Sequence, residues 1–131
     1  MSKFASRIRP HVQAELDAAG SADQAGLLED AFRHLERAHV LAQPSATEHS
    51  RVHFHMLRFA LKHRLLGEAI GQVLRLLLAG PLTVLGAIPI GNTGGSAVSG
   101  FQPMPVPSDL QQLIDGAGAL PPALPTSHDP I

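Results

Sequence analysis

Histidines placed in two helical patterns, one on each side of a proline, most constrain how this chain can fold. Before Pro44, Glu36 and His39 lie three positions apart, and after it His49 and His53 lie four positions apart. Residues at these spacings share one face of an α-helix. Because proline ends a helix, Pro44 predicts a short turn that folds the two helices back on each other. The sequence therefore predicts an antiparallel helix pair with imidazoles in its interface.

The amino-acid composition favours an all-α fold. Apolar residues make up 44% of the 131 residues, but aromatic residues only 4%, and Trp and Tyr are absent. The core is therefore built mainly from Leu, Ala, Val and Ile, of which Leu and Ala are strong helix formers. A chain of this length fits one domain with a modest hydrophobic core.

Apolar residues at helical spacing and their flanking stop signals divide the chain into helices. Gly20 predicts one helix end, and Gly80-Pro81 predicts another. Ser21 and Ser45 each begin a capping box, the pattern that starts a helix. The expected helices cover residues 6–19, 21–43, 45–64 and 65–79, with a short one at 108–114.

After Ile90 the sequence changes to Gly-rich and Pro-rich segments. We expect residues 91–96 to form a flexible, exposed loop, and residues 101–107 an extended strap across the helices. The loop lacks the lysine of a phosphate-binding motif, so an anion site there is not favoured. The overall prediction is a compact four-helix arrangement with an extended C-terminal strap. It forms one domain at 1–114, followed by a flexible, disordered tail at 115–131.

Charge and cysteine content exclude several functions. Ten basic residues nearly balance eleven acidic ones, so the chain has no surplus of positive charge for binding nucleic acid. Without cysteine, disulfides and thiolate metal sites are excluded. The N-terminus lacks the apolar run of a signal peptide, and we expect a cytoplasmic protein. Residues 70–90 are apolar, but Gln72, Arg75 and two prolines make a membrane span a poor interpretation.

The histidine pattern predicts a metal site. On a helical wheel His39, His49 and His53 fall within apolar arcs, with Glu36 on the flank of His39. Glu15 lies on the apolar stripe of the first helix, so it is an additional candidate ligand. We therefore expect one divalent transition metal ion. A nitrogen and oxygen donor set suits iron or zinc best, and nickel or cobalt also fit.

A second hypothesis keeps the same residues but needs no metal. The histidines of a non-catalytic helical homodimer or interaction module can hydrogen-bond across a helix interface and respond to pH. If a metal is bound, an open coordination position allows a non-haem, metal-dependent enzyme. The sequence identifies neither a reaction nor a small-molecule substrate.

Several short motifs together resemble a small bacterial family known as a domain of unknown function. The resemblance covers about residues 10–110 and rests on four motifs: Leu35-Glu36-Arg37-Ala38-His39, His-x-x-x-His from His49, Gly91-Asn92-Thr93-Gly94-Gly95 and Phe101-Gln102-Pro103-Met104-Pro105. It implies a bacterial intracellular protein whose motif positions coincide with the inferred ligands. It implies no activity, substrate or cofactor.

Overall fold

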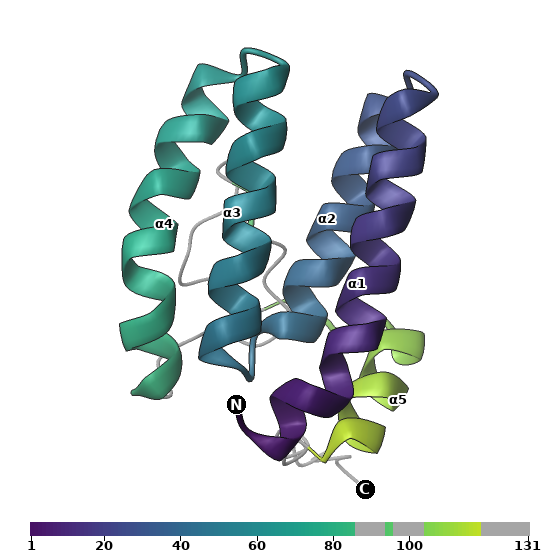
Figure 1. Ribbon diagram of the computed structural model, residues 1–131, viewed down its shortest axis with the longest axis vertical. Coiled ribbons are helices and arrows are strands. Elements are labelled where there is room, and N and C mark those ends of the chain that lie inside the picture. The colour runs from purple at the N-terminus through teal and green to yellow at the C-terminus, as the bar shows by residue number, and fades with distance from the viewer. Residues whose placement is uncertain (86–93, 96–103, 119–131) are drawn as a thin grey trace, which may run out of the picture.

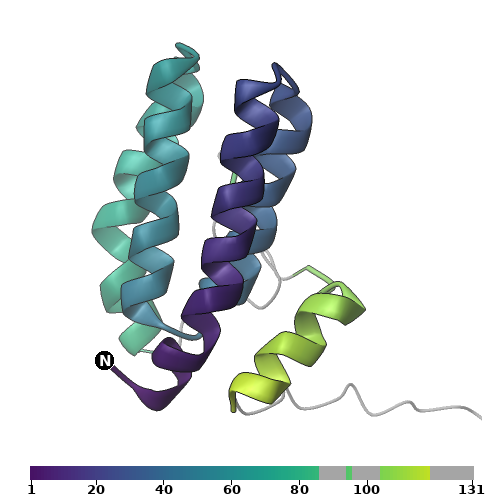
Figure 2. The same cartoon turned by 45° about the vertical axis from the view of Figure 1, so that its right-hand side comes forward.

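A computed structural model of the chain describes residues 1–85, 94–95 and 104–118, and within these ranges all regular structure is helical. The helices are α1 (Lys3–Gln24), α2 (Leu28–Ala42), α3 (Ala46–Lys62), α4 (Leu66–Val84) and α5 (Ser108–Ala117). The all-α prediction is therefore confirmed. Figure 1 shows the long helices side by side as two hairpins, α1 with α2 and α3 with α4. The short helix α5 lies across the lower part of the first hairpin (Figure 2).

The core lies between the hairpins and under α5, and it is aliphatic as the composition predicted. Phe59 is its single buried aromatic side chain among the described residues. Helices α2 and α3 pack against each other, so the turn at Pro44 forms the predicted antiparallel pair. The larger buried aliphatic side chains are Ile8, Val12 and Leu16 of α1, Leu35 and Leu41 of α2, Val52 and Met56 of α3, and Leu110 and Ile114 of α5.

The predicted boundary between the first two helices is wrong. Helix α1 continues through Gly20 and Ser21, and the chain turns at Gly26 instead, where φ is +77°. One glycine inside a helix costs only about 1 kcal/mol relative to alanine, which burial of the helix's apolar face offsets. Ser21 therefore caps no helix. Leu27 stands at the N-cap of α2 and makes no side-chain cap hydrogen bond.

Two other boundary predictions have different outcomes. Ser45 caps α3 as expected, because its Oγ accepts a hydrogen bond from the backbone N–H of Glu48 at 3.3 Å. The predicted stop at Gly80-Pro81 is wrong, since α4 continues to Val84. A proline can bend a helix instead of ending it, and the leucine-rich turns before this pair favour continuation.

The C-terminal predictions are only partly covered by the described residues. Met104 to Pro107 form an irregular segment, and Val106 packs against the core. Helix α5 continues three residues beyond Ile114, to Ala117. The remainder of the predicted strap and most of the predicted tail lie outside the described residues. Within the described chain, no helix combines the length and apolar character needed to cross a membrane.

Candidate metal centre

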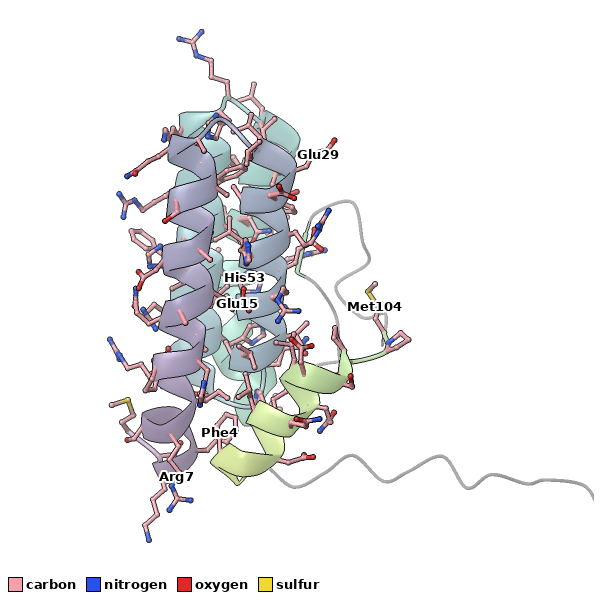
Figure 3. The ribbon with its side chains drawn as sticks, turned by 90° about the vertical axis from the view of Figure 1, so that its right-hand side faces the viewer. Phe4, Arg7, Glu15, Glu29, His53 and Met104 are labelled. Atoms are coloured by element: carbon pink, nitrogen blue, oxygen red, sulfur yellow. The ribbon has the colours of Figure 1, made fainter. Side chains whose placement is uncertain are left out.

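Three histidines from two helices meet inside the bundle. His39 comes from the last turns of α2, and His49 and His53 come from the first turns of α3. Each is only 2% exposed. Their Nε2 atoms face one another, at 2.8 Å between His49 and His39 and at 3.1 Å from His53 to each of the others. Figure 3 shows His53 at mid-height in the bundle.

The three Nε2 atoms are spaced as ligands of one metal ion would be. A circle through them has a radius of about 1.7 Å, which is shorter than a metal–nitrogen bond of about 2.0–2.1 Å. An ion about 1 Å from their plane is therefore at bonding distance from all three. Three imidazoles on one side of an ion leave a fourth tetrahedral position for another ligand.

Gln72 of α4 fixes the orientation of one of these rings. Its amide nitrogen donates to the side chain of Glu68 at 2.6 Å and to the backbone carbonyl of Gly94 at 2.7 Å. The amide oxygen therefore faces His53 Nδ1, at 2.6 Å, and Nδ1–H is the donor. In the neutral ring this places the lone pair of Nε2 toward the centre of the site. Metal-binding histidines are commonly oriented in this way by a partner of their second nitrogen.

Burial keeps two of the three rings neutral. It lowers the pKa of His49 to about 3, and the proximity of His53 contributes to the same shift. Burial also lowers the pKa of His53 to about 4, although the hydrogen bond with Gln72 acts in the opposite direction. A neutral imidazole is the form that binds metal, so at pH 7 no proton has to leave these two rings first.

A glycine pair that is distant in sequence covers the site. Gly94 has φ of +84°, and a Cβ atom added to it would lie 2.6 Å from Cδ2 of His39. The carbonyl of Gly95 accepts a hydrogen bond from Arg75, and Gly95 packs on Phe32. Both glycines are buried, so the prediction of an exposed loop is wrong at these two positions. Only a glycine fits against the His39 ring in this backbone conformation.

Glu36 lies next to the histidine cluster but outside it. Among the described residues, the group of mutually close ligand atoms contains only His39, His49 and His53. The carboxylate of Glu36 is half-buried, and burial raises its pKa, with the negative charge of Glu68 as the next cause. Glu36 and Glu68 both line a pocket of about 670 Å³ whose apolar walls include Phe32 and Phe59.

The structure places Glu15 in a different network. Its oxygens bond to His34 Nδ1 at 2.6 Å and to Arg37 Nε at 2.9 Å, and Arg37 also pairs with Asp109 of α5. A carboxylate on an apolar stripe needs a polar partner, and these side chains provide it. The partners are side chains of α2, so Glu15 joins α1 to α2. Its carboxylate bonds to these side chains and not to His39, His49 or His53.

Gln72 and Gly94 are the two residues of this site that sequence reasoning missed. Gln72 served only as an argument against a membrane span, yet it is fully buried. Its signal was an amide one turn after Glu68 in a mainly apolar helix, because a buried amide requires a polar partner inside the fold. No local pattern indicated that Gly94 would reach His39, because 55 positions separate them.

Comparison with known proteins gives one match. Residues 6–114 match the family model described as Protein of unknown function (DUF3703). No curated protein and no solved structure matches the chain.

Proposed function

Because the chain belongs to the DUF3703 family, whose description assigns no function, we propose from its site that it binds one divalent transition metal ion through His39, His49 and His53. The observation that carries the proposal is the convergence of three buried Nε2 atoms, one of them oriented by Gln72. The rest of the site is consistent with this role.

Hydrogen bonds alone cannot account for all three contacts between the ring nitrogens. A hydrogen bond between two ring nitrogens needs a proton on one and a lone pair on the other. Three nitrogens in a triangle cannot alternate in this way, so no placement of protons turns all three contacts into hydrogen bonds. At least one contact then brings together two lone pairs or two N–H groups, which repel each other in a buried site. A metal ion removes the conflict because it accepts a lone pair from every ring.

The donor set narrows the choice of metal. Three imidazoles without thiolate suit zinc and iron(II) best, and cobalt and nickel also fit. We retain Glu36 as a candidate fourth ligand because it lies one helical turn from His39 and its carboxylate is half-buried. Glu15 is not retained, since His34 and Arg37 already engage its oxygens.

A metal-dependent enzyme also requires a coordination position that no protein side chain fills, which is the fourth if only the three histidines bind the ion and a fifth if Glu36 binds it too. An open position on zinc supplies an activated water, and on iron(II) it supplies a binding place for a redox substrate. The pocket beside Glu36 and Glu68 has the volume of a small-molecule site. We propose catalysis only as an extension of metal binding, because no described group identifies a reaction.

The alternative of a pH-sensing module is less favoured. With pKa values of about 3 and about 4, His49 and His53 remain neutral across the range from about pH 5.5 to 7.5 in which such sensors act. The three imidazoles also contact one another within one chain, not across an interface between chains.

Metal analysis of untagged protein tests the proposal. We expect close to one equivalent of bound zinc or iron after purification or reconstitution, and its loss in both His39→Ala and His53→Ala. His34→Ala is the matched control, because His34 is partly exposed and bonds to Glu15 outside the histidine cluster, and this variant is expected to keep the metal. Less than about a tenth of an equivalent of any transition metal, unchanged in the two variants, contradicts the proposal.

A further inference from the structure

Helix α4 is polar on the face it packs inward. Of its residues from Leu66 to Leu78, only Glu68, Gln72 and Arg75 are charged or carry an amide. All three lie within one arc of the helix, at spacings of three and four. Gln72 is fully buried and bonds to His53, and Arg75 donates to the carbonyl of Gly95. The polar face of α4 therefore packs toward the histidine site and the glycines beside it.

The opposite face of α4 is apolar and exposed. Its six large aliphatic side chains are 43% to 70% exposed, and they are Leu66, Ile70, Val73, Leu74, Leu77 and Leu78. No charged or polar side chain interrupts this face between Leu66 and Leu78. Soluble helices normally show the reverse arrangement, and a continuous apolar face of this kind marks an interaction surface.

The position of α4 in the fold leaves this face open. Among the helices of the described chain, α4 packs only against α3, whereas α1 and α2 each contact several neighbours. Figure 1 shows α4 at the outer edge of the arrangement, on the side away from α1 and α5. A second partner for α4 is therefore missing within the described part of one chain.

We propose that this face forms a homodimer in which α4 packs against α4 of a second copy. Leu66, Ile70, Val73 and Leu77 follow one another at spacings of four, three and four, the seam that pairs two helices. A two-fold interface places the same surface on both sides, so an uncharged apolar face is complementary to itself. No opposite charge is needed on the partner.

The exposed area is close to what a stable dimer needs. The six side chains together expose on the order of 700 Å², compared with about 800 Å² per partner in a standard interface.

A lipid surface is the less suitable occupant of this face, because helices that lie on membranes carry lysine or arginine along their polar face. The inner face of α4 has one arginine, Arg75, which is bonded to Gly95.

Sedimentation velocity on the full chain tests the dimer. We expect twice the monomer mass at micromolar concentration without detergent. Replacing Ile70 and Leu77 together by glutamate is expected to raise the dissociation constant at least about 100-fold, by placing charges in the seam. Leu27→Glu is the matched control, since Leu27 is 54% exposed in the turn before α2 and its replacement leaves the dimer intact. Circular dichroism and metal content report whether each variant folds.

Disulfide cross-linking gives an independent readout, because the natural chain has no cysteine. Leu74→Cys, near the middle of the face, is expected to form a disulfide-linked dimer under mild oxidation, whereas Leu27→Cys forms no disulfide between the two copies. A wild-type chain that is monomeric at every concentration overturns the proposal. So does a dimer that the double glutamate variant leaves unchanged, or a monomer that instead binds lipid vesicles. Metal binding is measured separately, so either proposal can fail alone.

Discussion

Five of the eight histidines occupy two contrasting kinds of environment in this molecule. His34 and His63 each bond to a carboxylate, Glu15 and Asp23 respectively, and both pairs are partly exposed. The three histidines of the site are buried and face one another. A carboxylate partner satisfies an imidazole without any further ligand, whereas three imidazoles that meet leave a conflict that a cation removes. The difference teaches that burial together with mutual contact, and not histidine abundance, distinguishes the proposed metal site.

The largest expected difference between the two kinds of histidine is in the pH dependence of metal-free stability. His49 and His53 have folded pKa values of about 3 and about 4, below the unfolded value of about 6.5. The unfolded chain therefore binds more protons between these values, so stability falls as the pH drops below about 6.5. Each ring contributes up to about 1.4 kcal/mol per pH unit.

Urea unfolding in the presence of a chelator, at pH 7 and pH 5, measures this slope. The double variant His49→Asn and His53→Asn is expected to lose most of the pH dependence, whereas His63→Asn keeps it. Equal slopes in wild-type protein and the double variant would show that the two buried rings are not held neutral by the fold.

The second largest effect is expected on metal affinity when Gln72 is replaced. No amide of the described residues orients the ring in the two histidine–carboxylate pairs. Gln72→Leu removes the acceptor that orients His53, and metal affinity is expected to fall about 10- to 100-fold, as for other residues that orient metal ligands. Competition with a metal-binding dye measures the affinity. Gln112→Leu, at an exposed position of α5, is the control and leaves affinity unchanged. An unchanged affinity in Gln72→Leu would remove Gln72 from the site.

The smallest effect is expected at the glycine above His39. Gly94→Ala places a Cβ 2.6 Å from the ring in a left-handed backbone conformation, and we expect a loss of about 1–3 kcal/mol in the free energy of unfolding. Gly20→Ala provides the contrast, because nothing lies within 4 Å of its Cβ and the helix gains about 1 kcal/mol. Thermal or urea unfolding of both variants tests the contrast. Equal stability of the two would mean that residue 94 does not contact His39.

The sequence predicted those residues of the site that lie close together along the chain. His39, His49 and His53 lie on two helices joined by a short turn, so helical spacing alone indicated that they meet. The sequence did not indicate that Glu15 bonds to His34 and Arg37, because a helical wheel gives the direction of a side chain but not the neighbour that it faces. Gln72 and Gly94 reach the site from outside that helix pair, and no periodicity relates them to it.

The fold shows the same difference between features set by local sequence patterns and features set by contacts between distant residues. The helical class and the cap at Ser45 follow from local patterns, and the structure confirms them. Two helix boundaries depend instead on the balance between packing and local helix propensity. Helix α1 continues past Gly20 and the chain turns at Gly26, and α4 continues through Gly80-Pro81. Helix α4 has its polar face inside and its apolar face exposed, and this arrangement becomes clear only from the contact between Gln72 and His53.

X-ray absorption spectroscopy of the protein reconstituted with zinc tests the central claim most directly. Three imidazole nitrogens bound at about 2.0–2.1 Å are expected around the zinc in wild-type protein and in His34→Ala, with one imidazole fewer, or no bound zinc, in His39→Ala and His53→Ala. A zinc ion with fewer than three imidazole ligands in wild-type protein, or the same spectrum in all four proteins, would contradict the assignment of His39, His49 and His53 as the metal site.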